Sequence, residues 1–102
     1  MITLSDFRDD GTGNIVLRAG ECAITVTPMN IDDIFREARR QNIKEIEVTN
    51  DEMFIIATFL VANISPYFDM EYTREEAEKK ALLLMKEGKV DKFFGVKLVL
   101  QP

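Results

Sequence analysis

The chain has 102 residues and a formal net charge of −5; 46% of its residues are hydrophobic and 30% are charged. This length predicts one globular domain over residues 1–102, and this balance excludes a largely disordered chain. The chain contains no histidine and one cysteine, Cys22, which excludes Cys–His or Ser–His catalysis, the usual zinc and transition-metal sites, and an internal disulfide.

The first 27 residues carry the pattern of a β-meander. Residues 2–8 alternate apolar and polar side chains, and residues 15–19 resume this pattern after a segment of Asp, Gly, Thr and Asn residues that is typical of a tight turn. We therefore expect a β-hairpin. The run 22–27 alternates apolar and polar residues, which predicts a third strand with Cys22 in the core.

The next segments predict an amphipathic helix and a strand. Apolar residues at helical spacing favour a helix over residues 31–41, and Asn30 followed by Asp33 is typical of a capping arrangement. The arginines at positions 36, 39 and 40 could bind phosphate or carboxylate groups, although a solvated helix face is the favoured interpretation. Residues 43–48 predict a short strand with Ile46 and Val48 pointing inward.

The segment 53–64 is apolar on all sides. Thr49 and Glu52 form the pattern of a capping box before it, so we expect a helix that must be covered on nearly every side. A sheet and other helices of the same chain would cover it, or a second copy of the chain would. With about twelve apolar residues against the roughly 20 that a bilayer requires, it does not predict membrane insertion.

The last third of the chain predicts a helix between two strands. Residues 67–72 fit a short edge strand or an extended loop. Thr73 to Gly88 predicts a helix whose buried face includes Leu82, and residues 93–100 predict a final strand. The complete order, β-β-β-α-β-α-(β)-α-β, predicts an α+β fold with about three helices on one mainly antiparallel sheet formed by the N-terminal meander and the C-terminal strand.

Charge is unevenly distributed along the chain. Residues 1–78 contain sixteen acidic and seven basic residues, whereas residues 79–102 contain six lysines and two acidic residues. An acidic body and a basic end would suit self-association, and the apolar final strand could pair through an exposed edge. The negative net charge argues against direct binding to nucleic acid.

Two groups of candidate site residues follow from these patterns. Candidate interface residues are aromatic or basic: Phe59, Tyr67, Phe68, Tyr72, Lys89, Lys92, Phe93, Phe94 and Lys97. Candidate acidic-surface residues could face a basic macromolecule: Asp9, Asp10, Asp32, Asp33, Asp69 and Glu71. Adjacent carboxylates in the hairpin turn could also hold a hard cation, but they lack the spacing of a calcium or phosphate loop.

The residues Phe94-Gly-Val-Lys-Leu-Val99 resemble a terminal strand of some bacteriophage shell proteins. This resemblance implies a structural or accessory role in a phage or other mobile element as one interpretation. The favoured hypothesis is a non-catalytic assembly protein that acts as a homo-oligomer, with another protein as the alternative partner. We expect no enzyme activity and no cofactor.

Two other functions stay open. The first is an acidic regulator or inhibitor that mimics nucleic acid and binds a basic surface. The second is a small-ligand-binding domain with a pocket between the apolar helix and the sheet. Residues 1–10 have no basic region followed by an apolar core, so we expect no export and a cytoplasmic location, or the virion for a phage protein.

Overall fold

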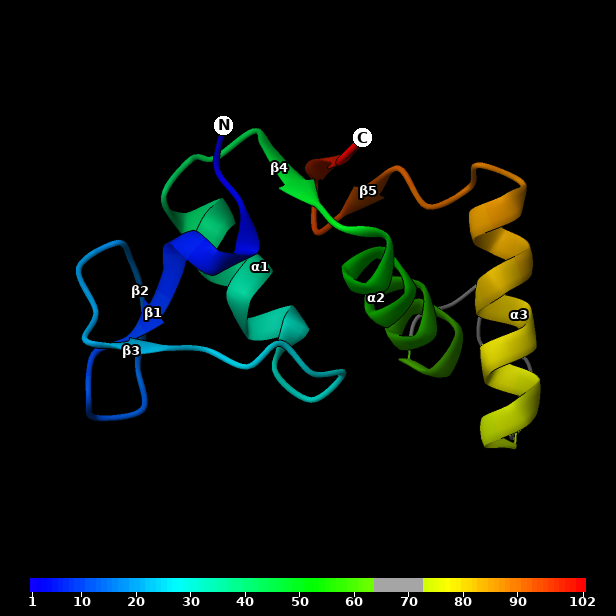
Figure 1. Cartoon of the computed structure of the whole chain (residues 1–102), viewed down its shortest axis with the longest axis horizontal. Helices are drawn as coiled ribbons and strands as arrows, with labels where there is room; N and C mark the ends of the chain where they lie inside the picture. The colour runs from blue at the N-terminus through cyan, green and yellow to red at the C-terminus, as the bar shows by residue number, and fades with distance from the viewer. Residues whose placement is uncertain (64–72) are drawn as a thin grey trace.

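The computed structural model describes residues 1–63 and 73–102, and these residues form an α+β fold (Figure 1). Over the described residues the chain has three α-helices and two three-stranded sheets. The α+β class and the order of helices and strands are confirmed, whereas the strands form two small sheets instead of one. The strand or loop expected over residues 67–72 lies outside the described residues.

The N-terminal sheet contains the expected hairpin. Strand β1 (Phe7–Asp9) pairs antiparallel with β2 (Ile15–Leu17) and, on its other side, with β3 (Cys22–Ala23). The strand order β2-β1-β3 therefore differs from a meander, in which the third strand would pair with the second. A short 3-10 helix, Leu4–Asp6, precedes β1 and shortens the first predicted strand.

This 3-10 helix explains why two sheets form. Thr3 makes a single parallel bridge to Glu47 in the other sheet, and the Glu47 N–H donates to the Ile2 carbonyl at 2.8 Å. The 3-10 turn then directs the chain away, so pairing with the second sheet stops there. The capping residues Thr3 and Asp6 set this turn, although in the alternating pattern of residues 2–8 they occupy the polar positions of an expected strand.

The cap of the 3-10 helix is acid-sensitive. The Thr3 N–H donates to Asp6 Oδ2 at 2.8 Å, and Arg18 Nε lies 3.5 Å from Asp6 Oδ1. The hydrogen bond from Thr3 is the main effect that lowers the pKa of Asp6 below its usual value of 3.8; partial burial opposes it and Arg18 assists it.

We expect Asp6→Asn to lower the free energy of unfolding at pH 7 by about 0.5–1 kcal/mol, because the asparagine keeps an acceptor but loses the charge. Because the pKa of Asp6 is depressed in the folded state, its contribution is complete above pH 3.8 and is lost as the pH falls through the folded value. Urea unfolding at several pH values should therefore show the two proteins converging below pH 3.8. A difference that stays constant down to pH 2 would contradict this role of the charge.

Cys22 is exposed, so its predicted place in the core is wrong. The alternating pattern extends to residue 27, but β3 ends at Ala23 and both of its residues face solvent. Cys22 lies opposite Asp9, near the end of the hairpin and at the margin of the sheet, where nothing covers it among the described residues.

The second sheet has the order β4-β6-β5. Strand β4 (Glu45–Val48) pairs parallel with β6 (Val96–Leu100), and β5 (Lys92–Phe93) pairs antiparallel with β6. Ile46 and Val48 are fully buried, as predicted. Contrary to the expectation of an exposed edge, β6 is the central strand, and β5 covers its Val96 and Lys97; the pairing with β5 does not extend over residues 98–100.

The predicted strand over residues 93–100 is in fact a hairpin. Phe94 and Gly95 have φ angles of 49° and 78° and connect β5 to β6 in a two-residue turn. Two consecutive positive φ angles are characteristic of the type I′ turn, which matches the twist of the strands it joins. Phenylalanine is unusual at the first position of such a turn, where Asn or Gly is preferred. The apolar run of residues 93–100 therefore gives no sequence signal of a turn.

Helix α1 (Ile31–Arg40) buries the predicted apolar face. Its start differs from the expected capping arrangement, because the Asn30 side chain makes no capping hydrogen bond. Instead, Asn30 Oδ1 accepts from the Thr27 N–H and Asn30 Nδ2 donates to the Thr25 carbonyl, both at 2.8 Å. Asn30 therefore fixes the loop before the helix.

Helix α2 (Asn50–Asn63) begins with the predicted capping box. The Thr49 N–H donates to Glu52 Oε1 at 2.8 Å, and the Glu52 N–H donates to Thr49 Oγ1 at 3.1 Å. Among the described residues, α2 is only partly covered. Its buried positions form one side of the helix: Met53, Ile56, Ala57, Leu60 and Val61. The remaining apolar positions are half-buried or exposed.

Helix α3 (Arg74–Lys86) packs against α2 at the periphery of the molecule (Figure 1). Thr73 caps its start, with Oγ1 accepting from the Glu76 N–H at 3.2 Å, and Gly88, whose φ is 69°, follows its end. Both limits agree with the predicted start and stop signals. The core itself lies between the helices and the second sheet and extends to Leu4 and Phe7 of the N-terminal segment.

Candidate functional site

The hairpin loop that carries Asp9 and Asp10 is held by its own side chains. Asp9 Oδ1 accepts from the Gly11 N–H at 2.7 Å and from the Gly13 N–H at 3.2 Å. Asp10 Oδ1 accepts from both the N–H and the hydroxyl of Thr12, at 2.8 and 2.6 Å, and these bonds lower the pKa of Asp10. The two carboxylates therefore shape the turn, as the favoured interpretation predicts.

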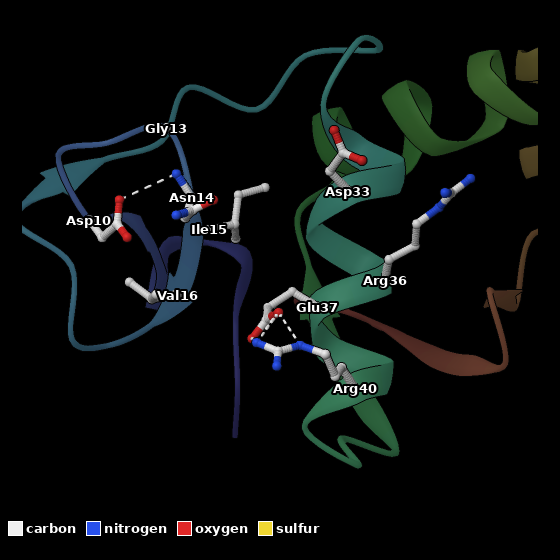
Figure 2. A pocket seen from close by; sticks show the side chains of 9 residues that line it. All are labelled: Asp10, Gly13, Asn14, Ile15, Val16, Asp33, Arg36, Glu37 and Arg40. Carbon is white, nitrogen blue, oxygen red and sulfur yellow. Dashed lines mark hydrogen bonds and ion pairs between the residues drawn. The ribbon is translucent and has the colours of Figure 1, made fainter.

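Helix α1 and this hairpin form the two walls of an open groove of about 550 Å³. Figure 2 shows Ile15 on the hairpin side and the side chains of Glu37 and Arg40 reaching from α1 toward β2. The acids of the groove, Asp10, Asp33 and Glu37, are interleaved with the bases Arg36 and Arg40.

The arginines of the groove already have partners. Glu37 accepts two hydrogen bonds from Arg40, both at 2.8 Å, in a bidentate pair (Figure 2). Arg36 lies 3.8 Å from Asp32 and stands over the ring of Phe94, with its guanidinium carbon 5.3 Å from the ring centre. The groove therefore carries three acids against two bases, and both of its arginines already lie near carboxylates.

The candidate acidic residues are distributed over different elements. Asp9 and Asp10 lie in the hairpin, whereas Asp32 and Asp33 lie in the first turn of α1. Asp10 and Asp33 line the same groove, but arginines lie beside them. The other two candidates, Asp69 and Glu71, lie outside the described residues.

The candidate aromatic residues separate into core and surface positions. Phe93 is 2% exposed and lies at the centre of an edge-to-face cluster, 4.9 Å from Phe35, 5.4 Å from Phe59 and 4.7 Å from Phe94 between ring centres. Because Phe93 is buried within the chain, its ring is not available to a partner, whereas Phe59 and Phe94 are half-buried. Tyr67, Phe68 and Tyr72 lie outside the described residues.

The candidate basic residues Lys89, Lys92 and Lys97 are all exposed. Lys89 Nζ lies 3.2 Å from Glu87 Oε2. Lys92 and Lys97 are paired residues of β5 and β6, so the hairpin places these two like charges side by side on one small sheet. The structure thus brings Lys92 and Lys97 together.

The outer face of α3 carries an apolar patch that the sequence analysis missed. Leu82 and Leu83 are 56% and 46% exposed, and Lys79 and Lys86 beside them are exposed as well. The prediction that Leu82 is buried is wrong. The buried residues Ala77, Ala81 and Leu84 set the inner side of the helix, and at 100° per residue Leu82 and Leu83 turn away from it. The spacing of Leu82 and Leu83 from these buried residues is the sequence signal that indicates their exposure.

Among the residues that the structure describes, no group of three or more cysteine or carboxylate side chains is placed to hold a metal ion. No helix of residues 1–63 or 73–102 is long and apolar enough to cross a membrane.

Comparison with protein-family models gives no match, and comparisons with curated proteins and with solved structures give none.

Proposed function

We propose that this chain is a non-catalytic interaction protein that assembles as a homo-oligomer through the outer face of α3, defined by Glu75, Lys79, Leu82, Leu83 and Lys86. The observation that carries this proposal is the exposure of two adjacent leucines on a peripheral helix. Contiguous exposed apolar residues rimmed by charged ones are typical of interaction surfaces.

The order of charges on this face favours a second copy of the chain as the partner. Glu75, Lys79, Leu82 and Lys86 follow the spacing i, i+4, i+7, i+11, which places them along one stripe of the helix. If two copies pack their α3 helices antiparallel about a twofold axis, Glu75 of each copy lies opposite Lys86 of the other, and Leu82 of each copy lies near the axis, opposite Lys79 of the other. The pairing is self-complementary, as a twofold interface requires.

Energetically, the leucines supply the attraction and the charges supply the register. Removing both leucines from water stabilises the contact, whereas exposed ion pairs contribute only about 0–1 kcal/mol each. The resulting interface is small, so we expect association that depends on protein concentration and weakens when salt screens the ion pairs.

Leu82→Lys tests the location of the interface. This change replaces an apolar side chain near the twofold axis with a positive charge opposite Lys79 of the other copy, so we expect the dimer dissociation constant to rise at least about tenfold. Sedimentation velocity over a range of concentrations measures it. Met29→Lys is the matched control, because Met29 is 89% exposed but lies before α1. Equal association of Leu82→Lys and the unmodified chain would contradict the proposal.

A further inference from the structure

A second pocket, of about 330 Å³, lies where the end of α1 meets the turn of the β5–β6 hairpin. Its lining includes Arg39, Asn42, Ile43, Lys44 and Phe94. It is separate from the outer face of α3 and differs from the groove of Figure 2 in its charge, because both of its charged lining residues are cations.

Local backbone chemistry builds this pocket. Helix α1 ends in a Schellman motif, in which the Ile43 N–H donates to the Ala38 carbonyl and the Asn42 N–H donates to the Arg39 carbonyl, both at 3.0 Å. Asn42 occupies the left-handed position of this motif with a φ of 59°, which asparagine tolerates. The motif reverses the chain, so Arg39 and Lys44 line one concavity.

Neither Arg39 nor Lys44 forms an ion pair with a carboxylate among the described residues. Arg40 pairs with Glu37 and Arg36 with Asp32, whereas no ion pair joins Arg39 or Lys44 to a described carboxylate. In a chain with a net charge of −5, a pocket lined by two cations and no acid is a local reversal of charge.

The helix end does not itself attract anions, since the last carbonyls of a helix carry partial negative charge. In α1, however, the carbonyls of Ala38 and Arg39 already accept hydrogen bonds of the Schellman motif. Their hydrogen-bonding capacity is thus partly used, and the guanidinium and ammonium groups keep donors for a bound anion. A direct charge-assisted bond is stronger than the dipole effect.

The other wall of the pocket is apolar. Ile43 and Phe94 are half-buried, and Val96 is buried. Phe94 holds a positive φ of 49°, which is strained for a bulky residue, and Arg36 packs over its ring. The strained turn keeps an aromatic ring beside two cations.

We propose that this pocket binds a small organic anion, in which a phosphate or carboxylate head contacts Arg39 and Lys44 and a flat apolar body lies against Ile43 and Phe94. This inference goes beyond self-association and does not rest on it. Arginine offers a planar fork of donors to such a head, and lysine adds a compact charge. The open shape of the pocket favours weak, millimolar binding.

The test is an NMR titration of the amide resonances of the full chain with phenyl phosphate, with benzoate, and with benzyl alcohol as the neutral probe. We expect saturable shifts centred on Asn42, Lys44 and Gly95 for one or both anions and none for the alcohol. The anion that binds more tightly identifies the head group.

Matched variants separate this site from general charge attraction. Arg39→Gln and Lys44→Gln should each weaken binding about tenfold, because each removes one charge-assisted contact. Arg40→Gln removes the same charge from the same helix turn but should leave binding unchanged. Shifts spread over all basic residues, an equal loss with Arg40→Gln, or no saturation with either anion would overturn the proposal.

Discussion

Replacing Phe93 by alanine is expected to lower the free energy of unfolding by about 3–5 kcal/mol, because the ring is buried and its neighbours relax only partly into the space that it leaves. Phe93 is 2% exposed and contacts the rings of Phe35, Phe59 and Phe94. It joins α1, α2 and the β5–β6 hairpin, so its removal leaves a cavity where three elements meet.

Urea unfolding followed by circular dichroism measures this loss. Phe94→Ala is the matched control: it removes the same side chain from the next position, but Phe94 is only half-buried, so we expect a loss of about 1 kcal/mol. Equal losses for the two variants would show that the Phe93 ring is not the centre of this cluster.

Gly20→Ala is expected to cost about 1–3 kcal/mol, the range for inserting atoms into a packed site. A Cβ atom at position 20 would lie 2.4 Å from the Cβ of Arg8 and 2.7 Å from the carbonyl oxygen of Asp9. Both contacts involve β1, the central strand of the N-terminal sheet, so the backbone must move and its pairing with β3 must weaken.

Thermal unfolding of Gly20→Ala and of Ala19→Ser gives the comparison, since Ala19 is the neighbouring residue and is exposed. Hydrogen exchange should also rise first at the amides of Arg8 and Glu21, because the Glu21 N–H donates to the Asp9 carbonyl at 3.0 Å. An alanine variant as stable as the unmodified chain would contradict the close approach of these two segments.

The sequence predicted those elements whose ends carry specific polar signals. The start of α2 is indicated by Thr49 with Glu52, and the start of α3 by Thr73 with Glu76. The structure contains the corresponding capping hydrogen bonds. The hairpin turn was predictable for the same reason, since aspartate and glycine at residues 9–14 have few other uses in such a pattern.

Elements without such signals were less predictable. An apolar run shows no break at Phe94–Gly95, so one strand was expected where a hairpin occurs. The parallel pairing of β4 with β6 joins segments about fifty residues apart, and no local pattern encodes it. It makes β6 the central strand of its sheet, where the sequence suggested an edge strand.

Candidate site residues followed the same rule. Lys92 and Lys97 meet because a tight turn joins their strands, and Arg39 meets Lys44 because a Schellman motif reverses the chain. Leu82 was placed on the wrong side of α3 because its neighbours are also apolar, so residue type alone does not give the phase of the helix.

The native mass of the unmodified chain, measured by size-exclusion chromatography with light scattering at low and high salt, tests self-assembly most directly. The proposed pairing of α3 helices predicts a mass about twice that of the 11.7 kDa chain at high protein concentration and low salt, with a shift toward the monomer as salt screens the Glu75–Lys86 pairs. A mass of 11.7 kDa at every concentration in both buffers would contradict the account.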